Sequence, residues 1–161
     1  ITDKTPELIE ACKVSLLDRG FGQKSGANGS GWGKANKVNL WARAKDGNRA
    51  YSMLRELINK NIAPNLWDFH PPYQMDGNCG YTSGVCEMLC YSSDDIIELL
   101  PALPEEWKNG SVKGLCARGG YSLDFTWENG EIKSLSVYSS CGKKTARIKT
   151  GDEIKTVKTV G

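Results

Sequence analysis

The residues that decide the fold class are 121–138, which read YSLDFTWENGEIKSLSVY. Leu123, Phe125 and Trp127 alternate there with polar residues, as in a strand that buries one face. The Asn-Gly pair at 129–130 is a strong signal for a tight hairpin turn. This stretch therefore predicts two antiparallel strands.

Short apolar segments separated by turn signals continue on both sides of this hairpin. The strand candidates are 96–100, 112–117, 121–127, 132–138, 145–148 and 154–157. Such closely spaced short strands are typical of an antiparallel sheet or a small sandwich. The sequence therefore predicts a β-sheet domain over residues 93–161.

The chain before residue 93 shows helical spacing of its apolar residues instead. The helix candidates are 5–18, 32–44, 49–60 and 80–91. Ser30 can cap the second of them. The glycine-rich stretch from Gly20 to Gly31 predicts a flexible loop, and residues 61–78 show no clear periodicity. The expected class is α + β, with helices in 1–92 followed by the β domain.

Composition excludes several classes of protein. The 161 residues carry a net charge of only +2, and no cluster of Lys and Arg interleaves with aromatics, so a nucleic-acid binder is not expected. No apolar run is long enough to span a membrane. Ile1 stands where a Met is expected, which suggests that an N-terminal part is missing.

Six cysteines without a CxxC pair, and a single histidine, give no zinc pattern, so no metal is expected. Cys86 and Cys90 could share a metal from one helix face, although two small buried apolar side chains are the commoner arrangement. Unpaired cysteines favour a reducing compartment or an anaerobic source. No glycine-rich phosphate loop follows a strand, so no cofactor is expected.

The most informative stretch for function is HPPYQMDGN at 70–78. It places a His, an Asp, two amides and a Tyr in one rigid segment that leads into a helix. The positive end of a helix favours a charged carboxylate, and Asp76 could then act as a general base for water. Two alternatives remain open: Asp76 or Asn78 could simply cap the helix, and His70 could be a hydrogen-bonded core histidine.

Three further residues have two readings each. Trp32 and Trp41 could both be core residues, or could form part of a platform for a sugar ring. Glu87 could line a cleft, although a surface or ion-pair role is commoner for a Glu in such a helix.

Several runs together resemble glycoside hydrolase family 95. The matching runs are Gly31-Trp32, NLWAR (39–43), DGNRAY (46–51), HPPYQMDGN (70–78), LLPALP (99–104), Trp107, GSVKGL (110–115) and ARGGY (117–121). The resemblance covers roughly residues 5–138. It implies the last helices of an (α/α)6 barrel, followed by a C-terminal β domain.

The resemblance also implies an activity: hydrolysis of terminal α-1,2-linked L-fucose with inversion, some members preferring α-L-galactosides. It makes Asp76 the catalytic base. The expected substrate contacts are His70, Trp32, Tyr73, Gln74 and Asn78. Gly33 and Cys79 depart from the residues common in the family, which leaves the substrate preference open.

The general-acid Glu of such enzymes belongs to an earlier barrel segment. The expected partners are therefore a fucosylated oligosaccharide and the remaining N-terminal part of the same enzyme, and the isolated chain is expected to be inactive. A bacterial source is expected, with cytoplasmic and secreted locations both open. The alternative is a noncatalytic glycan-binding or structural module, or a remnant without activity.

Overall fold

A computed structural model describes residues 5–19, 29–69, 73–93 and 95–160. The elements follow the chain in the order α1 (Pro6–Asp18), α2 (Gly31–Arg43), α3 (Gly47–Asn61), α4 (Met75–Leu89), β1 (Cys90–Ser92), β2 (Ile97–Leu99), β3 (Gly110–Ala117), β4 (Tyr121–Glu128), β5 (Glu131–Ser139), β6 (Thr145–Thr150) and β7 (Glu153–Lys158). This order confirms the α + β class, with helices that fit part of a helical barrel followed by a β domain. His70, most of the glycine-rich loop and Asp94 lie outside the described residues.

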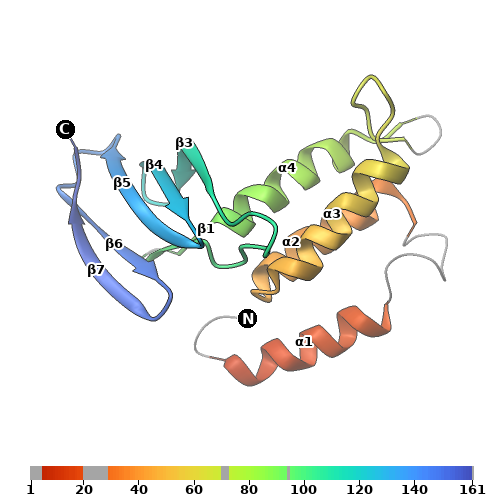
Figure 1. The fold of residues 1–161 in the computed structure, drawn as a ribbon, viewed down its shortest axis with the longest axis horizontal. Coiled ribbons are helices and arrows are strands. Elements are labelled where there is room, and N and C mark those ends of the chain that lie inside the picture. The colour runs from red at the N-terminus through yellow and green to blue at the C-terminus, as the bar shows by residue number, and fades with distance from the viewer. Residues whose placement is uncertain (1–4, 20–28, 70–72, 94, 161) are drawn as a thin grey trace.

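Helices α2 and α3 form a hairpin, α4 lies beside α2, and α1 runs along α2 on the side away from α4 (Figure 1). Both hairpin helices begin with a side-chain cap. The Gly33 N–H donates to Ser30 Oγ (3.4 Å), and the Arg49 N–H donates to Asp46 Oδ1 (3.0 Å). These bonds satisfy backbone donors that have no partner inside the helix, and they explain why the helices begin there.

A stripe of glycines on α4 allows α4 to approach α2 closely. Gly77, Gly80 and Gly84 share one face of the helix because they are spaced by three and four residues. A Cβ atom on Gly80 would lie 2.8 Å from the Ala35 side chain, and one on Gly84 would crowd Val38. The glycines therefore bring the backbones of the two helices close together. The two helices run in the same direction, so their first turns lie at the same end (Figure 1).

The expected bounds of α4 were wrong at both ends. The helix was placed at 80–91, but it runs from Met75 to Leu89. Prolines prevent helix only up to their own position, and glycines in the first turns are tolerated because the packing on α2 requires them. At the other end, Cys90 already pairs with Leu99 in an antiparallel ladder between β1 and β2.

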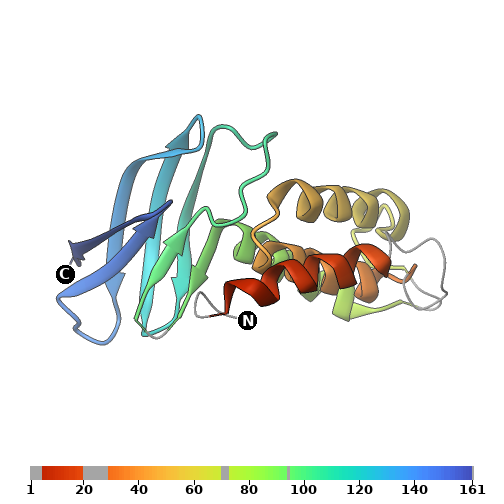
Figure 2. The ribbon, with the colours of Figure 1, turned by 90° about the horizontal axis from the view of Figure 1, so that it is seen from below.

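The β region forms two sheets, in the strand orders β1-β2-β6-β7 and β3-β4-β5. The two sheets lie next to each other (Figure 2), and side chains from both form one hydrophobic core. This is a small sandwich, one of the two arrangements that were expected. Asn129 and Gly130 have positive φ angles of 51° and 78°, which confirms the hairpin turn. The named strands pair antiparallel except β2 and β6, where Ile97 lies opposite Ile148 in a parallel ladder.

The helices and the sandwich are joined by an ion pair and by an aromatic contact. The Lys45 ammonium lies 2.9 Å from the buried Glu98 carboxylate, which also lies 3.5 Å from Lys149. Trp107 packs edge-on against Tyr51, with ring centroids 5.6 Å apart, and contacts both hydrophobic cores. The sandwich is therefore attached at the end of α2 and α4 that is opposite to their first turns (Figure 1).

The cysteines differ in burial, and we expect them to differ in reactivity for that reason. Burial, together with the Glu87 carboxylate and Cys86, raises the pKa of the Cys90 thiol to about 12. Cys141, in contrast, is exposed on the sandwich. Because the thiolate is the nucleophile, we expect iodoacetamide at about pH 8 to label Cys141 and to leave Cys90 unmodified until the protein is denatured. Peptide mass spectrometry measures this, and labelling of native Cys90 at the rate of Cys141 would contradict it.

Candidate active site

The carboxylate of Asp76 lies exposed in the first turn of α4. The N-cap position belongs to Gln74, which makes no side-chain cap bond. Asp76 lies inside the helix and does not occupy that position, so the reading in which it serves as the N-cap residue is wrong. The side chain lies at the positive end of α4.

Asn78 ties the preceding loop to the helix. Its Oδ1 accepts the Asp68 N–H (2.9 Å), and its Nδ2 donates to the Leu66 carbonyl (2.7 Å). The Asp68 carbonyl in turn accepts the Gln74 N–H (3.1 Å). These bonds hold the two ends of the loop together. Because the Asn78 amide bonds to the backbone of the loop and the N-cap position belongs to Gln74, Asn78 is not an N-cap residue either. A contact of Asn78 with substrate stays a prediction.

Asn61, a buried residue at the end of α3, also holds this loop in place. Asn61 Oδ1 accepts from the ammonium of Lys34 (2.8 Å), which is only 3% exposed, and Asn61 Nδ2 donates to the Gly29 carbonyl (3.2 Å). The Asn61 carbonyl accepts the Phe69 N–H. One residue at the end of α3 therefore connects the start of α2 to the loop that precedes α4.

Asp68 is a further candidate residue that was not predicted from the sequence. Its side chain is fully buried, and a Cβ atom on either Gly31 or Gly77 would overlap one of its carboxylate oxygens. Both oxygens therefore lie against the first turn of α2, and Oδ2 also lies against the first turn of α4. The sequence carries only a weak signal, an Asp between two aromatic residues in an irregular loop, and a contact with two distant glycines is visible only in three dimensions.

The two tryptophans of α2 differ clearly in their exposure to solvent. Trp41 is 2% exposed in the helical core, whereas Trp32 is 45% exposed. Trp32 follows Gly31 in the chain, as Asp76 precedes Gly77, and both glycines contact Asp68. The structure thus brings Trp32 and Asp76 to the same end of the paired helices, at their first turns.

Two further candidates lie just before α4. The Tyr73 ring is exposed and packs against Trp67, with ring centroids 4.8 Å apart. Gln74 is half-buried, and its buried Oε1 accepts no hydrogen bond from the described residues. Both belong to the segment that carries Asp76, whereas His70 lies outside the described residues.

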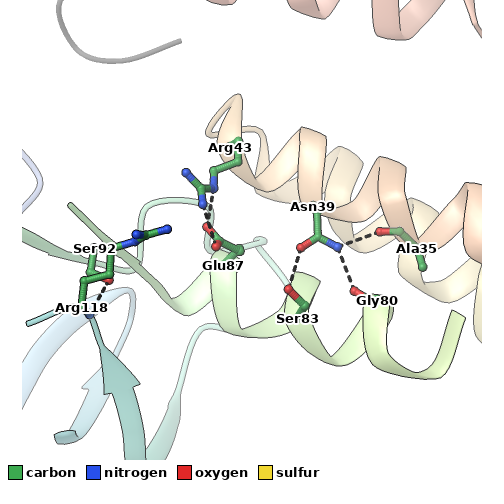
Figure 3. Close-up of polar contacts among 8 residues, drawn as sticks. All are labelled: Ala35, Asn39, Arg43, Gly80, Ser83, Glu87, Ser92 and Arg118. Atoms are coloured by element: carbon green, nitrogen blue, oxygen red, sulfur yellow. Dashed lines mark hydrogen bonds and ion pairs between the residues drawn. The ribbon is translucent and has the colours of Figure 1, made fainter. Parts of the chain in front are cut away.

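A line of polar contacts connects α2 and α4 further along (Figure 3). Asn39 Nδ2 donates to the carbonyls of Ala35 (2.9 Å) and Gly80 (2.8 Å), and Ser83 Oγ donates to Asn39 Oδ1 (3.0 Å). Beyond them, Arg43 Nη2 lies 2.9 Å from Glu87 Oε1. The structure thus supports the ion-pair reading of Glu87.

Three surface cavities lie among the described residues outside the segment that carries Asp76. One of about 350 Å³ opens between α1 and α2, beside Leu16 and Leu40, and others border the sandwich. Within the described ranges, no three His, Cys, Asp or Glu side chains converge as metal ligands would. Over the same ranges, no helix has the length and apolarity needed to cross a bilayer.

Comparison with known proteins gives the family. The family model described as "Glycosyl hydrolase family 95 catalytic domain" matches residues 1–89, and "Glycoside hydrolase family 95, C-terminal domain" matches residues 91–160. Both are domains of glycoside hydrolases, and together they cover almost the whole chain. The chain belongs to glycoside hydrolase family 95, which confirms the resemblance.

Curated relatives agree. "Alpha-L-fucosidase 2" of Arabidopsis thaliana is 34% identical over 149 residues, which are 85% of this chain and 17% of the relative. "Probable alpha-fucosidase A" is 35% identical over 136 residues in Aspergillus oryzae (74% of this chain, 18% of the relative) and 31% over 159 in Aspergillus niger (88% and 20%). The chain spans about a fifth of their length. These plant and fungal relatives give no support to a bacterial source.

Proposed function

We propose that this chain is the base-supplying portion of an inverting exo-glycosidase that removes terminal α-L-fucosyl residues, or the related α-L-galactosyl residues, from glycans. The observation that carries the proposal is the juxtaposition of Asp76 and Trp32. An exposed carboxylate and an exposed aromatic ring lie at the first turns of two parallel helices, whose starts meet at one buried Asp. A sugar needs both a base and an apolar face to stack on.

In this proposal Asp76 takes a proton from a water molecule as the water oxygen bonds to the anomeric carbon. The bond from that carbon to the leaving oxygen breaks on the opposite face, and a general-acid Glu protonates the leaving oxygen. In inverting enzymes the two carboxyl groups are about 6.5–9.5 Å apart, which leaves room for the water. The Glu would come from the N-terminal part of the enzyme.

The proposed sugar contacts are His70, Trp32, Tyr73, Gln74 and Asn78. The exposure of Trp32 and Tyr73 supports apolar contact with the sugar ring, and the buried Gln74 Oε1 is an acceptor that could receive a sugar hydroxyl. Asn78 would contact the sugar from the base of the loop that it holds. His70 would bind a hydroxyl group.

The proposal divides the chain into a part of the catalytic barrel (1–92) and a C-terminal β domain (93–161). Large apolar side chains that are exposed on the helices support a missing neighbour: Leu8, Val14, Leu17 and Leu40. Surfaces of this kind are usually covered by another part of the protein. The remaining N-terminal part of the same enzyme would cover them, and the isolated chain would be inactive without its Glu.

The stereochemistry of the product tests the proposal. We expect the complete enzyme, given a terminal α-1,2-fucosylated oligosaccharide, to release β-L-fucose first, because water attacks the face opposite the leaving group. Proton NMR of the anomeric signals during the first turnovers measures this, and a β-L-fucoside is the control that should not react. Initial release of α-L-fucose would refute the inverting mechanism, and a lack of any fucose release would refute the substrate.

A further inference from the structure

The buried carboxylate of Asp68 occupies an unusual place in the fold. The residue is 0% exposed, and each of its two oxygens fills the space that a Cβ atom on Gly31 or on Gly77 would need. Gly31 is the first residue of α2, and Gly77 belongs to the first turn of α4. A negative charge at the positive ends of two helices is electrostatically favourable, so this carboxylate stabilises both first turns at once.

The two first turns also carry the two best-placed residues of the candidate site. Trp32 is adjacent to Gly31, and Asp76 is adjacent to Gly77, so a shift of either glycine moves a site residue with it. The absence of side chains on the glycines brings the backbone against Asp68. The relative position of Trp32 and Asp76 is therefore set largely by what lies between the glycines.

The backbone of Asp68 is also held in place, by two hydrogen bonds. Its N–H donates to Asn78 Oδ1 (2.9 Å), and its carbonyl accepts the Gln74 N–H (3.1 Å). It also bridges to Ile62, in an antiparallel arrangement at the base of the loop. Asp68 is thus fixed by the turns on both sides of Asp76 and cannot move independently of them.

We propose that Asp68 is a positioning residue: its buried carboxylate sets the first turns of α2 and α4 against each other, so that Asp76 and Trp32 meet the same sugar unit. This inference rests on the proposed function. Asp68 touches no substrate in this scheme and acts through Asp76. An Asn at this place has nearly the same size, but it puts an NH₂ group against one helix start, where backbone N–H groups are also donors.

The test is Asp68→Asn in the complete enzyme, compared with Asp76→Asn and with the double variant. We expect kcat on a fucosylated oligosaccharide to fall about 100-fold with KM changed less, because small displacements of a catalytic group cost about that much. On the Asp76→Asn background, the same change should have little further effect, because the base through which Asp68 acts is already gone. Glu98→Gln is the matched control: it neutralises another buried carboxylate, at the opposite end of the helices, and should leave kcat unchanged.

The outcomes separate the inference from the proposed function. If Asp76→Asn is inactive while Asp68→Asn keeps the wild-type kcat, the inference fails and the function stands. Equal losses from Asp68→Asn on both backgrounds would mean a merely structural role, which also overturns it. If the wild-type enzyme releases no fucose, both proposals fall.

A second variant covers the case in which Asp68→Asn does not fold. Gly31→Ala removes no carboxylate, but it adds a methyl group on α2 at the place that the Asp68 carboxylate occupies. We expect a smaller loss of kcat in the same direction, about 10-fold, because the crowded carboxylate must shift. A folded Gly31→Ala enzyme with wild-type kcat and KM would overturn the inference.

Discussion

Replacement of Asp76 by Asn is expected to lower kcat of the complete enzyme by about 10³-fold, equivalent to about 4 kcal/mol of transition-state stabilisation. An amide cannot accept the proton of the attacking water, while its size and its place in the first turn of α4 stay the same. Because the side chain is exposed, the melting temperature should change little. Steady-state fucose release and calorimetry measure the two effects.

The matched control is Asp95→Asn, which removes one exposed carboxylate near β2, in the sandwich. It should leave kcat unchanged, so that a loss specific to Asp76 cannot be attributed to net charge. An Asp76→Asn enzyme that retains a tenth or more of wild-type turnover, by contrast, would remove Asp76 from the mechanism.

Trp41→Ala is expected to have the largest effect on stability, a loss of about 3–5 kcal/mol in the free energy of unfolding. The ring is 2% exposed in the helical core, and the Arg49 guanidinium lies 4.9 Å from its centroid, so truncation leaves a large cavity and removes a cation–π contact. The midpoint of urea unfolding of the complete enzyme measures the loss.

Trp32→Ala, the same substitution at an exposed position of α2, is the matched comparison for Trp41→Ala. Its ring is 45% exposed, so the same truncation should cost little stability. It should instead raise KM by about 10-fold, the equivalent of about 1.4 kcal/mol of lost stacking on the sugar. Destabilisation by both variants to the same extent, with KM unchanged in both, would exclude a sugar platform at Trp32.

Residues with a local pattern could be placed from the sequence. The alternation of Leu123, Phe125 and Trp127 gives the buried face of β4, because strand periodicity is a property of neighbouring residues. Ser30 gives the start of α2 for the same reason: a cap acts within three residues. The Asn-Gly turn at 129–130 needs only its own backbone.

Features that depend on distant contacts could not be placed in this way. The start of α4 was expected five residues too late because residues 61–78 show no helical periodicity, whereas glycines in the first turns allow contact with α2. Trp32 and Trp41 look equivalent in the sequence and differ only in what surrounds them. The role of Asp68 depends on two glycines from separate helices, and no spacing rule connects them.

The parallel ladder between β2 and β6 has a consequence for how the protein is made on the ribosome. Strand β2 leaves the exit tunnel well before β6, so the edge of β2 that later pairs with β6 is at first unpaired. A two-stranded ribbon is marginally stable in water, and an open edge can pair with another chain. The partly synthesised sandwich is therefore prone to aggregate through this edge until β6 (Thr145–Thr150) has emerged. Pairing of β6 with β2 then covers the edge.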